Sequence, residues 1–168
     1  MFPRARKIAL LLNPTNPVQL LSVEATESAA MQRKVTIQRF GVSALGELDG
    51  AVAEMARQGF EAVAITQDGL YILSAGAVAS SVARHRLPSI GFPEFAEAGG
   101  MLGYGVNIIS VFRRAAYFVD RILKGTKPGD LPVEQASKFE FVVNLKTAKA
   151  LGVKIPQPLV VRADKVIE

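Results

Sequence analysis

Polar and aromatic side chains follow three short apolar runs of the chain, at the points where each run ends. They are, in chain order, Asn13, Thr15 and Asn16, then Thr66, Gln67 and Asp68, then Phe92, Glu94 and Phe95. A few hydrogen-bonding groups beside flat aromatic rings suit a small organic ligand better than a phosphate. For each polar residue taken alone, the alternative is that it caps the helix that follows.

Catalytic chemistry finds little support in the sequence. The chain has no cysteine and one histidine, which excludes thiolate chemistry and a histidine metal cluster. That residue, His85, stands between two arginines near the end of a predicted helix, where a C-terminal cap explains it better than a general base. Asp68 and Glu94 could pair as acid and base, but the sequence does not give their separation. No nucleophile elbow, dinucleotide-binding turn or Walker lysine is present, so we expect no enzyme and no cofactor or metal.

Composition narrows the class of protein further. The 168 residues are 49% hydrophobic and 21% charged, which predicts one globular unit with a normal core. No apolar run approaches the roughly 20 residues that span a membrane. The net charge of +5 is scattered, without basic runs or interleaved aromatic residues, so nucleic acid is not an expected partner.

Strands and helices must alternate to position these residues. The predicted strands are 7–12, 35–40, 61–65 and 88–91, and the predicted helices are 18–33, 45–58 and 70–85. This alternation predicts a parallel, doubly wound, Rossmann-like α/β fold, a three-layer sandwich with right-handed crossovers. Ligands of such sheets bind beyond the carboxyl ends of the strands, so the three polar and aromatic exits should share one rim.

The stretch from Leu87 to Asn107 joins the last of these strands to the second half of the chain. Phe92 and Phe95 are expected to be exposed, and a Gly99–Gly100 pair precedes a short apolar run that ends at Tyr104. Aromatic residues followed by conformationally free glycines are typical of a ligand mouth beside a hinge. An ordinary surface loop is the alternative.

The second half departs from simple alternation. It predicts a strongly amphipathic helix over 108–125, a Pro/Gly connector over 124–132, a strand over 139–143, a helix over 145–151 and an extended tail over 158–162. Arg113 and Arg114 could hold a carboxylate, but their neighbours on the helix favour a solvated face.

Three long motifs carry a resemblance to a known family. They are FPEFAEAGGMLGYGVN (92–107), RRAAYFVDRILKGTKPGDLPVEQ (113–135) and FVVNLKTAKALG (141–152), with an Asn-Pro-x-Asn-Pro turn at 13–17 upstream. In this order they resemble the C-terminal half of ABC-transporter substrate-binding proteins of the tryptophan/tyrosine-uptake type. The resemblance covers nearly the whole chain.

The resemblance implies a lobe of the type I periplasmic-binding-protein fold, which closes with a second lobe on a small ligand and delivers it to a membrane permease. It places the strand exits at the ligand, and puts Tyr104 and Asn107 where the chain crosses to the other lobe. Aromatic amino acids are the implied cargo, with Phe92, Phe95 and Tyr104 available for stacking. Core or hinge packing is the alternative for Tyr104.

The resemblance also sets expectations for organisation. The expected parts are a ligand-binding lobe (1–107), a helix and connector that would pack on a first lobe (108–132) and a return strand, short helix and tail (133–168). Family members are about twice as long, so the apolar face of the 108–124 helix is expected to be exposed and to support a homodimer. Gly103 stands where the family often carries serine.

More than one cellular location and more than one function are compatible with the sequence. The resemblance implies the periplasm, whereas no signal peptide precedes the first strand, which would leave the chain as written in the cytoplasm. The expected function is binding of a small molecule without catalysis. The alternatives are an isolated interaction or sensor domain that has lost transport, and a small doubly wound enzyme.

Overall fold

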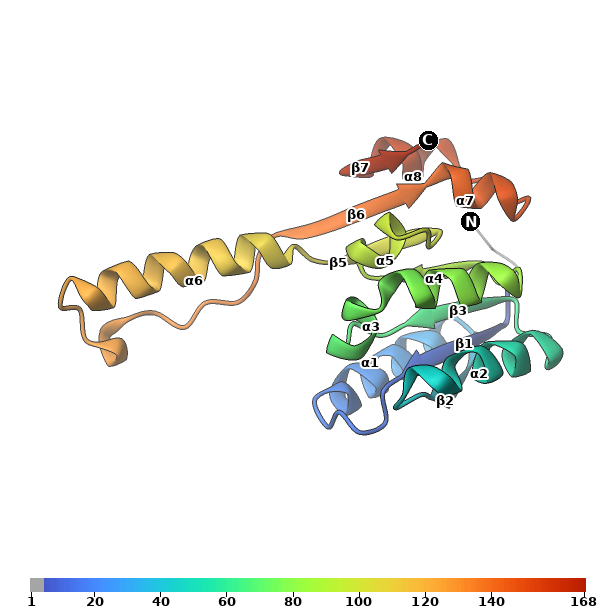
Figure 1. The fold of residues 1–168 in the computed structure, drawn as a ribbon, viewed down its shortest axis with the longest axis horizontal. Helices are drawn as coiled ribbons and strands as arrows, with labels where there is room; N and C mark the ends of the chain where they lie inside the picture. The colour runs from blue at the N-terminus through green and yellow to red at the C-terminus, as the bar shows by residue number, and fades with distance from the viewer. Residues whose placement is uncertain (1–4) are drawn as a thin grey trace.

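A seven-stranded sheet forms the centre of the computed structural model, which describes residues 5–168. Its strand order is β2-β1-β3-β4-β5-β6-β7 (Figure 1). Neighbouring strands are parallel except for β5 and β6, which are antiparallel. The predicted α/β fold with a parallel sheet is therefore confirmed. The antiparallel pair arises because the chain leaves the sheet after β5 and returns along the same line as β6.

The bounds of the elements agree with most of the predicted ranges. The strands are β1 (Lys7–Leu12), β2 (Thr36–Gly41), β3 (Ala62–Ile65), β4 (Ser89–Gly91), β5 (Leu102–Val106), β6 (Phe139–Asn144) and β7 (Lys165–Ile167). The helices are α1 (Gln19–Gln32), α2 (Leu45–Arg57), α3 (Gly69–Leu73), α4 (Ala75–Arg84), α5 (Pro93–Glu97), α6 (Ile108–Leu123), α7 (Leu145–Ala150) and α8 (Gln157–Val161), with a 3-10 turn η1 (Pro128–Asp130).

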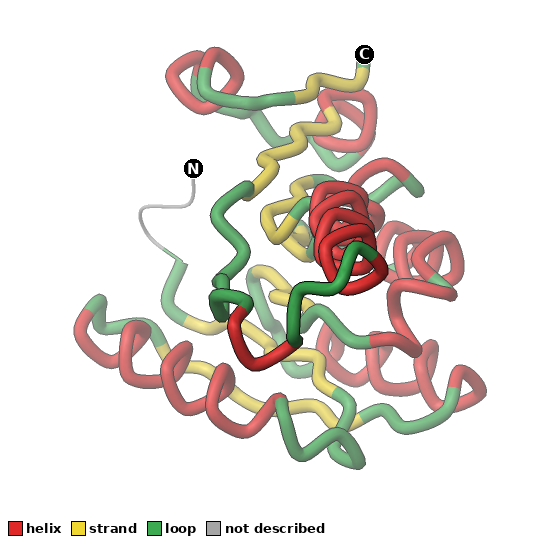
Figure 2. The backbone as a smooth tube through the Cα atoms, turned by 90° about the vertical axis from the view of Figure 1, so that its left-hand side faces the viewer, coloured by secondary structure: helices red, strands yellow, loops and turns green. Residues whose placement is uncertain are grey.

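The core lies on both faces of the sheet, with helices on either side of the strands (Figure 2). Alternate residues of β1 serve the two faces. Leu11 packs in one cluster with α2 and α4, while Leu10 packs on the other face with Val23 of α1. Burial on both faces explains why β1 is a continuous apolar run.

Three sequence predictions were wrong in local structure. The helix predicted over 70–85 is two helices, α3 and α4, separated at Ser74. The residues that follow the strand at 88–91, expected to be a ligand mouth or a surface loop, begin α5, whose first residue is Pro93, and proline is well suited to that position. The tail at 158–162, predicted to be extended, lies in α8. Proline is tolerated in a first helical turn, and the apolar residues Leu159 and Val160 pack against a separate hydrophobic cluster that contains Val143 and Ile155.

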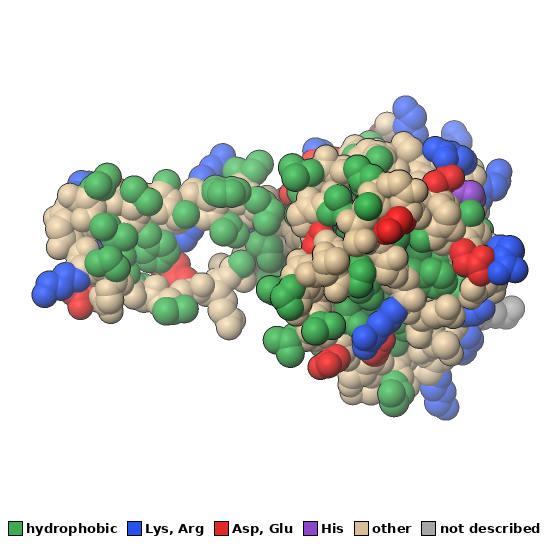
Figure 3. Space-filling model, turned by 60° about the horizontal axis from the view of Figure 1, so that its bottom comes forward, with side chains coloured by type: hydrophobic (Ala, Val, Ile, Leu, Met, Phe, Trp, Pro, Cys, Tyr) green, Lys and Arg blue, Asp and Glu red, His purple; other side chains and the backbone are tan. Residues whose placement is uncertain are grey.

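An arm projects away from the sheet (Figure 1). It consists of α6 and the return segment 124–138, and none of the residues of α6 is buried. Arg114 of α6 joins the two halves through its ion pair with Glu134, and its guanidinium lies 4.1 Å from the ring centroid of Tyr117 on the same helix. Figure 3 shows hydrophobic side chains along the arm and an opening between its two halves. No helix among residues 5–168 is long and apolar enough to cross a membrane.

Candidate functional site

The exits of β1, β3 and β4 lie on one edge of the sheet. The register pairs Leu11 with Ile65 and Ala64 with Ile90, so Asn13, Thr66 and Phe92 follow at nearly the same level. We call this edge, residues 13–19, 66–69 and 92–94, the rim. The prediction that the three exits share one rim is confirmed, and the arm leaves the sheet from the same edge (Figure 1).

A buried carboxylate lies at the centre of the rim. Asp68 is 4% exposed, and its oxygens accept hydrogen bonds from Asn13 Nδ2 (3.1 Å), Asn16 Nδ2 (2.7 Å) and Gln19 Nε2 (3.0 Å). The backbone N–H of Leu70 donates a further bond of 2.9 Å, which makes Asp68 the N-cap of α3. We call Asp68 and the three side-chain amides the carboxylate hub. It joins the exit of β1 to the exit of β3.

The hub keeps Asp68 negatively charged. Burial acts to raise the pKa of Asp68, but the hydrogen bonds from Asn16, Asn13 and the Leu70 N–H lower it by more, so that the pKa lies below its usual value. The charge is enclosed by its donors, so the role of Asp68 is to hold the rim together. Capping therefore explains Asp68, while the two asparagines do more than cap, since they cross from one strand exit to the other.

Sequence reasoning missed Gln19, which is 5% exposed in the first turn of α1. Its Nε2 donates to Asp68, and its Oε1 accepts from Thr66 Oγ1 (2.8 Å) and from the backbone N–H of Asn13 (3.2 Å). Thr66 thus serves the same network. Elsewhere in this helix, Leu21 is 77% exposed and Val23 is buried.

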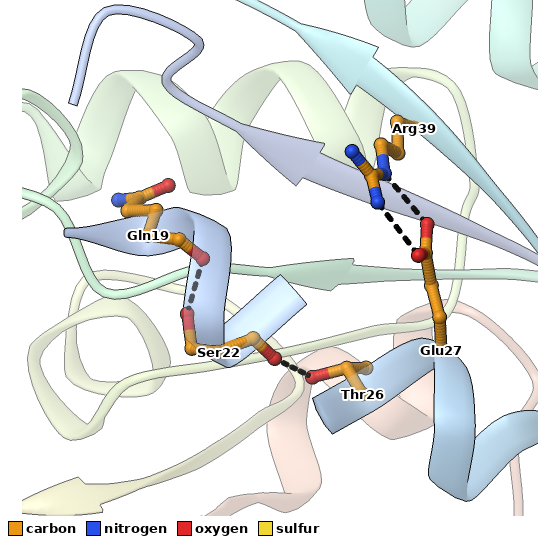
Figure 4. A network of polar contacts seen from close by, with 5 residues as sticks. All are labelled: Gln19, Ser22, Thr26, Glu27 and Arg39. Atoms are coloured by element: carbon orange, nitrogen blue, oxygen red, sulfur yellow. Dashed lines mark hydrogen bonds and ion pairs between the residues drawn. The ribbon is translucent and has the colours of Figure 1, made fainter. Parts of the chain in front are cut away.

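The helix that carries Gln19 is tied to the sheet by an ion pair and has side-chain hydrogen bonds within its own first turns (Figure 4). Arg39 of β2 donates two hydrogen bonds, of 2.6 and 2.7 Å, to the carboxylate of Glu27. Ser22 Oγ donates to the backbone oxygen of Gln19 at 2.8 Å. An exposed ion pair contributes little stability, so its effect here is to orient α1.

The loop that leaves β1 is ordered by its own side chains. Asn13 Oδ1 accepts from both the N–H (3.1 Å) and the Oγ1 (2.8 Å) of Thr15. Asn16 Oδ1 accepts from the N–H of Val18 at 3.1 Å. Such turns, in which a side chain bonds a backbone group two residues on, fix the loop without tertiary contacts. Thr15 is exposed at the surface of the rim.

Two rim residues keep unused hydrogen-bonding capacity within the described part of the chain. The side chain of Gln67 is exposed and makes no hydrogen bond to residues 5–168, and its Oε1 lies 3.3 Å from where a Cβ on Gly105 would stand. Pro93 Cδ lies 3.1 Å from the same point, so Gln67 reaches across the rim towards α5. The Oε2 atom of Glu94 is buried and has no hydrogen-bond partner there.

The expectation that Phe92 and Phe95 are exposed is wrong. They are 1% and 0% exposed and belong to the main core. Phe95 occupies the space above Gly91 and Gly100, where a Cβ on either glycine would lie 2.8 Å or 2.1 Å from its ring. Neither ring can form an open wall for a ligand in this arrangement.

Tyr104 and Asn107 lie at the base of the arm. Tyr104 is 57% exposed and stacks on Phe139, with ring centroids 5.8 Å apart. It points away from α5, since Gly103 and Gly105 on either side face Pro93, and it lines a groove of about 480 Å³ with Ile90 and Phe141. Asn107 caps α6 through Ser110 N (2.8 Å) and donates to Glu140 (2.6 Å).

Comparisons with known proteins agree with this fold. Residues 1–167 match the model of a family described as ABC transporter substrate binding protein. The tyrosine-binding protein of Clostridioides difficile (strain R20291) is 22% identical over 153 residues, which cover 90% of this chain and 44% of that protein.

Two solved structures superpose on the chain with a TM-score of 0.88. A conserved domain protein from Vibrio cholerae is 20% identical, and the match covers 98% of this chain and 55% of that one. An ABC domain from Streptococcus pneumonia in complex with L-Trp is 25% identical, with 98% and 56% covered. The chain thus spans about half the length of the relatives it matches.

Proposed function

The chain belongs to the ABC transporter substrate-binding protein family, and from this premise we propose that its rim forms one wall of a binding site for an aromatic amino acid, without catalysis. The carboxylate hub is the observation that supports this most strongly. It fixes two strand exits in one geometry before any ligand arrives, which lowers the entropic cost of binding. Relatives named for tyrosine and solved with L-Trp support the choice of ligand class.

We divide the rim residues into two roles. Asn13, Asn16, Thr66 and Asp68 position the rim, because their polar groups are engaged with one another and with Gln19. Thr15, Gln67 and Glu94 are the polar residues proposed to reach the ligand. Phe92 and Phe95 support the rim from the core, and we assign them no direct contact in this arrangement.

The remaining proposed residues lie where the arm begins. The exposed ring of Tyr104 offers a stacking surface for an aromatic ligand, and Asn107 fixes the direction in which α6 leaves the sheet. In this proposal, residues 1–107 form the ligand-binding lobe, 108–132 pack on a second lobe and 133–168 return to the sheet. Closure of the two lobes is driven by contacts that the ligand makes only in the closed state. We propose that the protein acts in the periplasm and delivers its ligand to a membrane permease.

The test of this function is thermal unfolding of the wild-type protein against an amino-acid panel. We expect L-tryptophan, L-tyrosine or L-phenylalanine to raise the melting temperature, since a ligand at 100 times its Kd stabilises by about 2.7 kcal/mol. For a chain of this size that is a rise of roughly 5–10 °C. L-alanine serves as the matched small ligand. If no amino acid shifts the transition, the rim is not a binding site for this class, and the interaction-domain alternative gains support.

We also propose that the arm mediates formation of a homodimer through the 108–124 helix. Phe112, Val119 and Leu123 are 72%, 54% and 82% exposed along α6. They recur at a helical spacing and so form one apolar stripe, and exposed stripes of this kind mark sites of association.

Light scattering at micromolar concentration is expected to give twice the chain mass of 18.0 kDa. The double substitution Phe112→Asp with Val119→Asp should restore the single mass, because it places charges on the stripe. Arg113→Gln, on the same helix but outside the stripe, is the matched control and should leave the dimer intact. A wild-type protein with the mass of one chain would contradict the dimer.

A further inference from the structure

One carboxylate oxygen at the rim is buried without a donor. Among residues 5–168, Oε2 of Glu94 is the one buried side-chain nitrogen or oxygen atom without a hydrogen-bond partner. Buried acceptors in native proteins nearly always have a partner, and a carboxylate oxygen without one is strongly unfavourable. The missing donor is therefore expected to come from outside the described chain.

The surroundings of α5 leave Glu94 little freedom to find another partner. Pro93 approaches Gly103 with its Cα 2.8 Å from where a Cβ would stand, and Phe95 fills the space above Gly91 and Gly100. These contacts fix the helix on the sheet on both sides of Glu94. The next acidic residue of the same helix differs, since Glu97 accepts from Lys165 Nζ at 2.5 Å. Glu97 is satisfied by the protein, and the buried oxygen of Glu94 is not.

Glu94 lies on the edge of the sheet where the proposed ligand would bind. It lies in the first turn of α5, which begins at the carboxyl end of β4, and helix side chains lean towards the N-terminal end of their helix. That end is the rim. Gln67, whose amide also has no partner among residues 5–168, reaches Pro93 from the exit of β3. Unpartnered acceptors thus stand at two neighbouring strand exits, whereas the charge of Asp68 is already enclosed by donors.

We propose that Glu94 Oε2 accepts a hydrogen bond from the ammonium group of the bound amino acid, with Gln67 Oε1 beside it. A cationic nitrogen is the donor class that suits a buried carboxylate, because the bond is charge-assisted. Glu94 then determines specificity, since it selects ligands with a cationic nitrogen over acids of the same shape that lack it. This inference rests on the proposed function.

Calorimetric titration with two ligands tests the assignment. L-tryptophan carries the ammonium group, and indole-3-propionic acid has the same skeleton without it. Glu94→Gln is expected to weaken L-tryptophan binding about 10- to 100-fold, the range of a lost charged hydrogen bond, and to leave indole-3-propionic acid within about twofold. Glu97→Gln, on the same helix, is the matched control and should change neither affinity.

A second readout does not need a ligand. Because the buried oxygen of Glu94 has no hydrogen-bond partner among residues 5–168, Glu94→Gln should leave the melting temperature of the free protein unchanged or raise it. A fall of several degrees would show a structural partner and overturn the proposal. Equal weakening of both ligands, or full retention of L-tryptophan affinity, would overturn it while leaving the proposed function standing. A wild-type protein that binds neither ligand would overturn both.

Discussion

Replacing Asp68 by alanine is expected to lower the free energy of unfolding by about 3–4 kcal/mol, the range for breaking a buried charged network. The substitution leaves three side-chain amides and the Leu70 N–H without their acceptor. It also removes the N-cap of α3, a loss of about 1 kcal/mol by itself. Urea unfolding of the wild type and the variant measures the difference.

Two control variants distinguish the effect of breaking the carboxylate hub from the effect of removing an acidic side chain. Asp130→Ala removes an exposed acid from the 3-10 turn η1 and should change stability by less than about 0.5 kcal/mol. Asp68→Asn keeps the shape and the cap but cannot accept from every amide. The loss in its free energy of unfolding should therefore lie between those of Asp68→Ala and Asp130→Ala. A loss below about 1 kcal/mol in Asp68→Ala would show that the hub does not hold the rim together.

Gly103→Ser is expected to lower the free energy of unfolding by about 3 kcal/mol, the upper range for overpacking a core. A Cβ at Gly103 would stand 2.6 Å from the backbone oxygen of Phe92 and 2.8 Å from the Cα of Pro93. Because these are backbone atoms, α5 itself must move, and the geometry of Glu94 moves with it. Thermal or urea unfolding measures the loss, and ligand affinity should fall in the same variant.

Gly129→Ser is the matched control, since nothing lies within 4 Å of a Cβ at Gly129. A Gly103→Ser protein as stable as the wild type would mean that α5 is not fixed on β5 as described. The close approach also gives a physical reason for glycine at position 103. The helix packs on β5 at a distance that a side chain does not allow.

The sheet and its rim could be predicted because they depend on local patterns. The continuous apolar run of β1 indicates burial on both faces, and alternation of strand and helix fixes which ends of the strands meet. Asn13, Thr66 and Phe92 therefore fell on one edge as expected. Nothing beyond the order of elements was needed for this part of the site.

The burial of the aromatic residues could not be predicted, because it depends on partners far along the chain. Phe95 is buried because Gly91 and Gly100 leave room for its ring. The sequence shows these glycines but not which ring they admit. Gln19 was missed for a similar reason, since an amide in a first helical turn gives no signal of a carboxylate such as Asp68, which follows three elements later, after β3.

The proposed roles of the arm depend on what covers its apolar stripe. Exposed residues on α6 are compatible both with a second copy of the chain and with a second lobe. The two arrangements differ in stoichiometry, so light scattering and ligand titration together separate them. A particle with twice the chain mass would assign the stripe to association, and a particle with the mass of one chain that still binds ligand would leave the stripe to a second lobe.

The central claim is that the rim binds the ligand, and its most direct test is amide hydrogen exchange measured with and without the amino acid. With L-tryptophan bound to the wild-type protein, we predict slower exchange at 13–19, 66–70 and 92–97, and no change at 145–151 on the far part of the sheet. Protection confined to the arm, with the rim unchanged, would contradict the account.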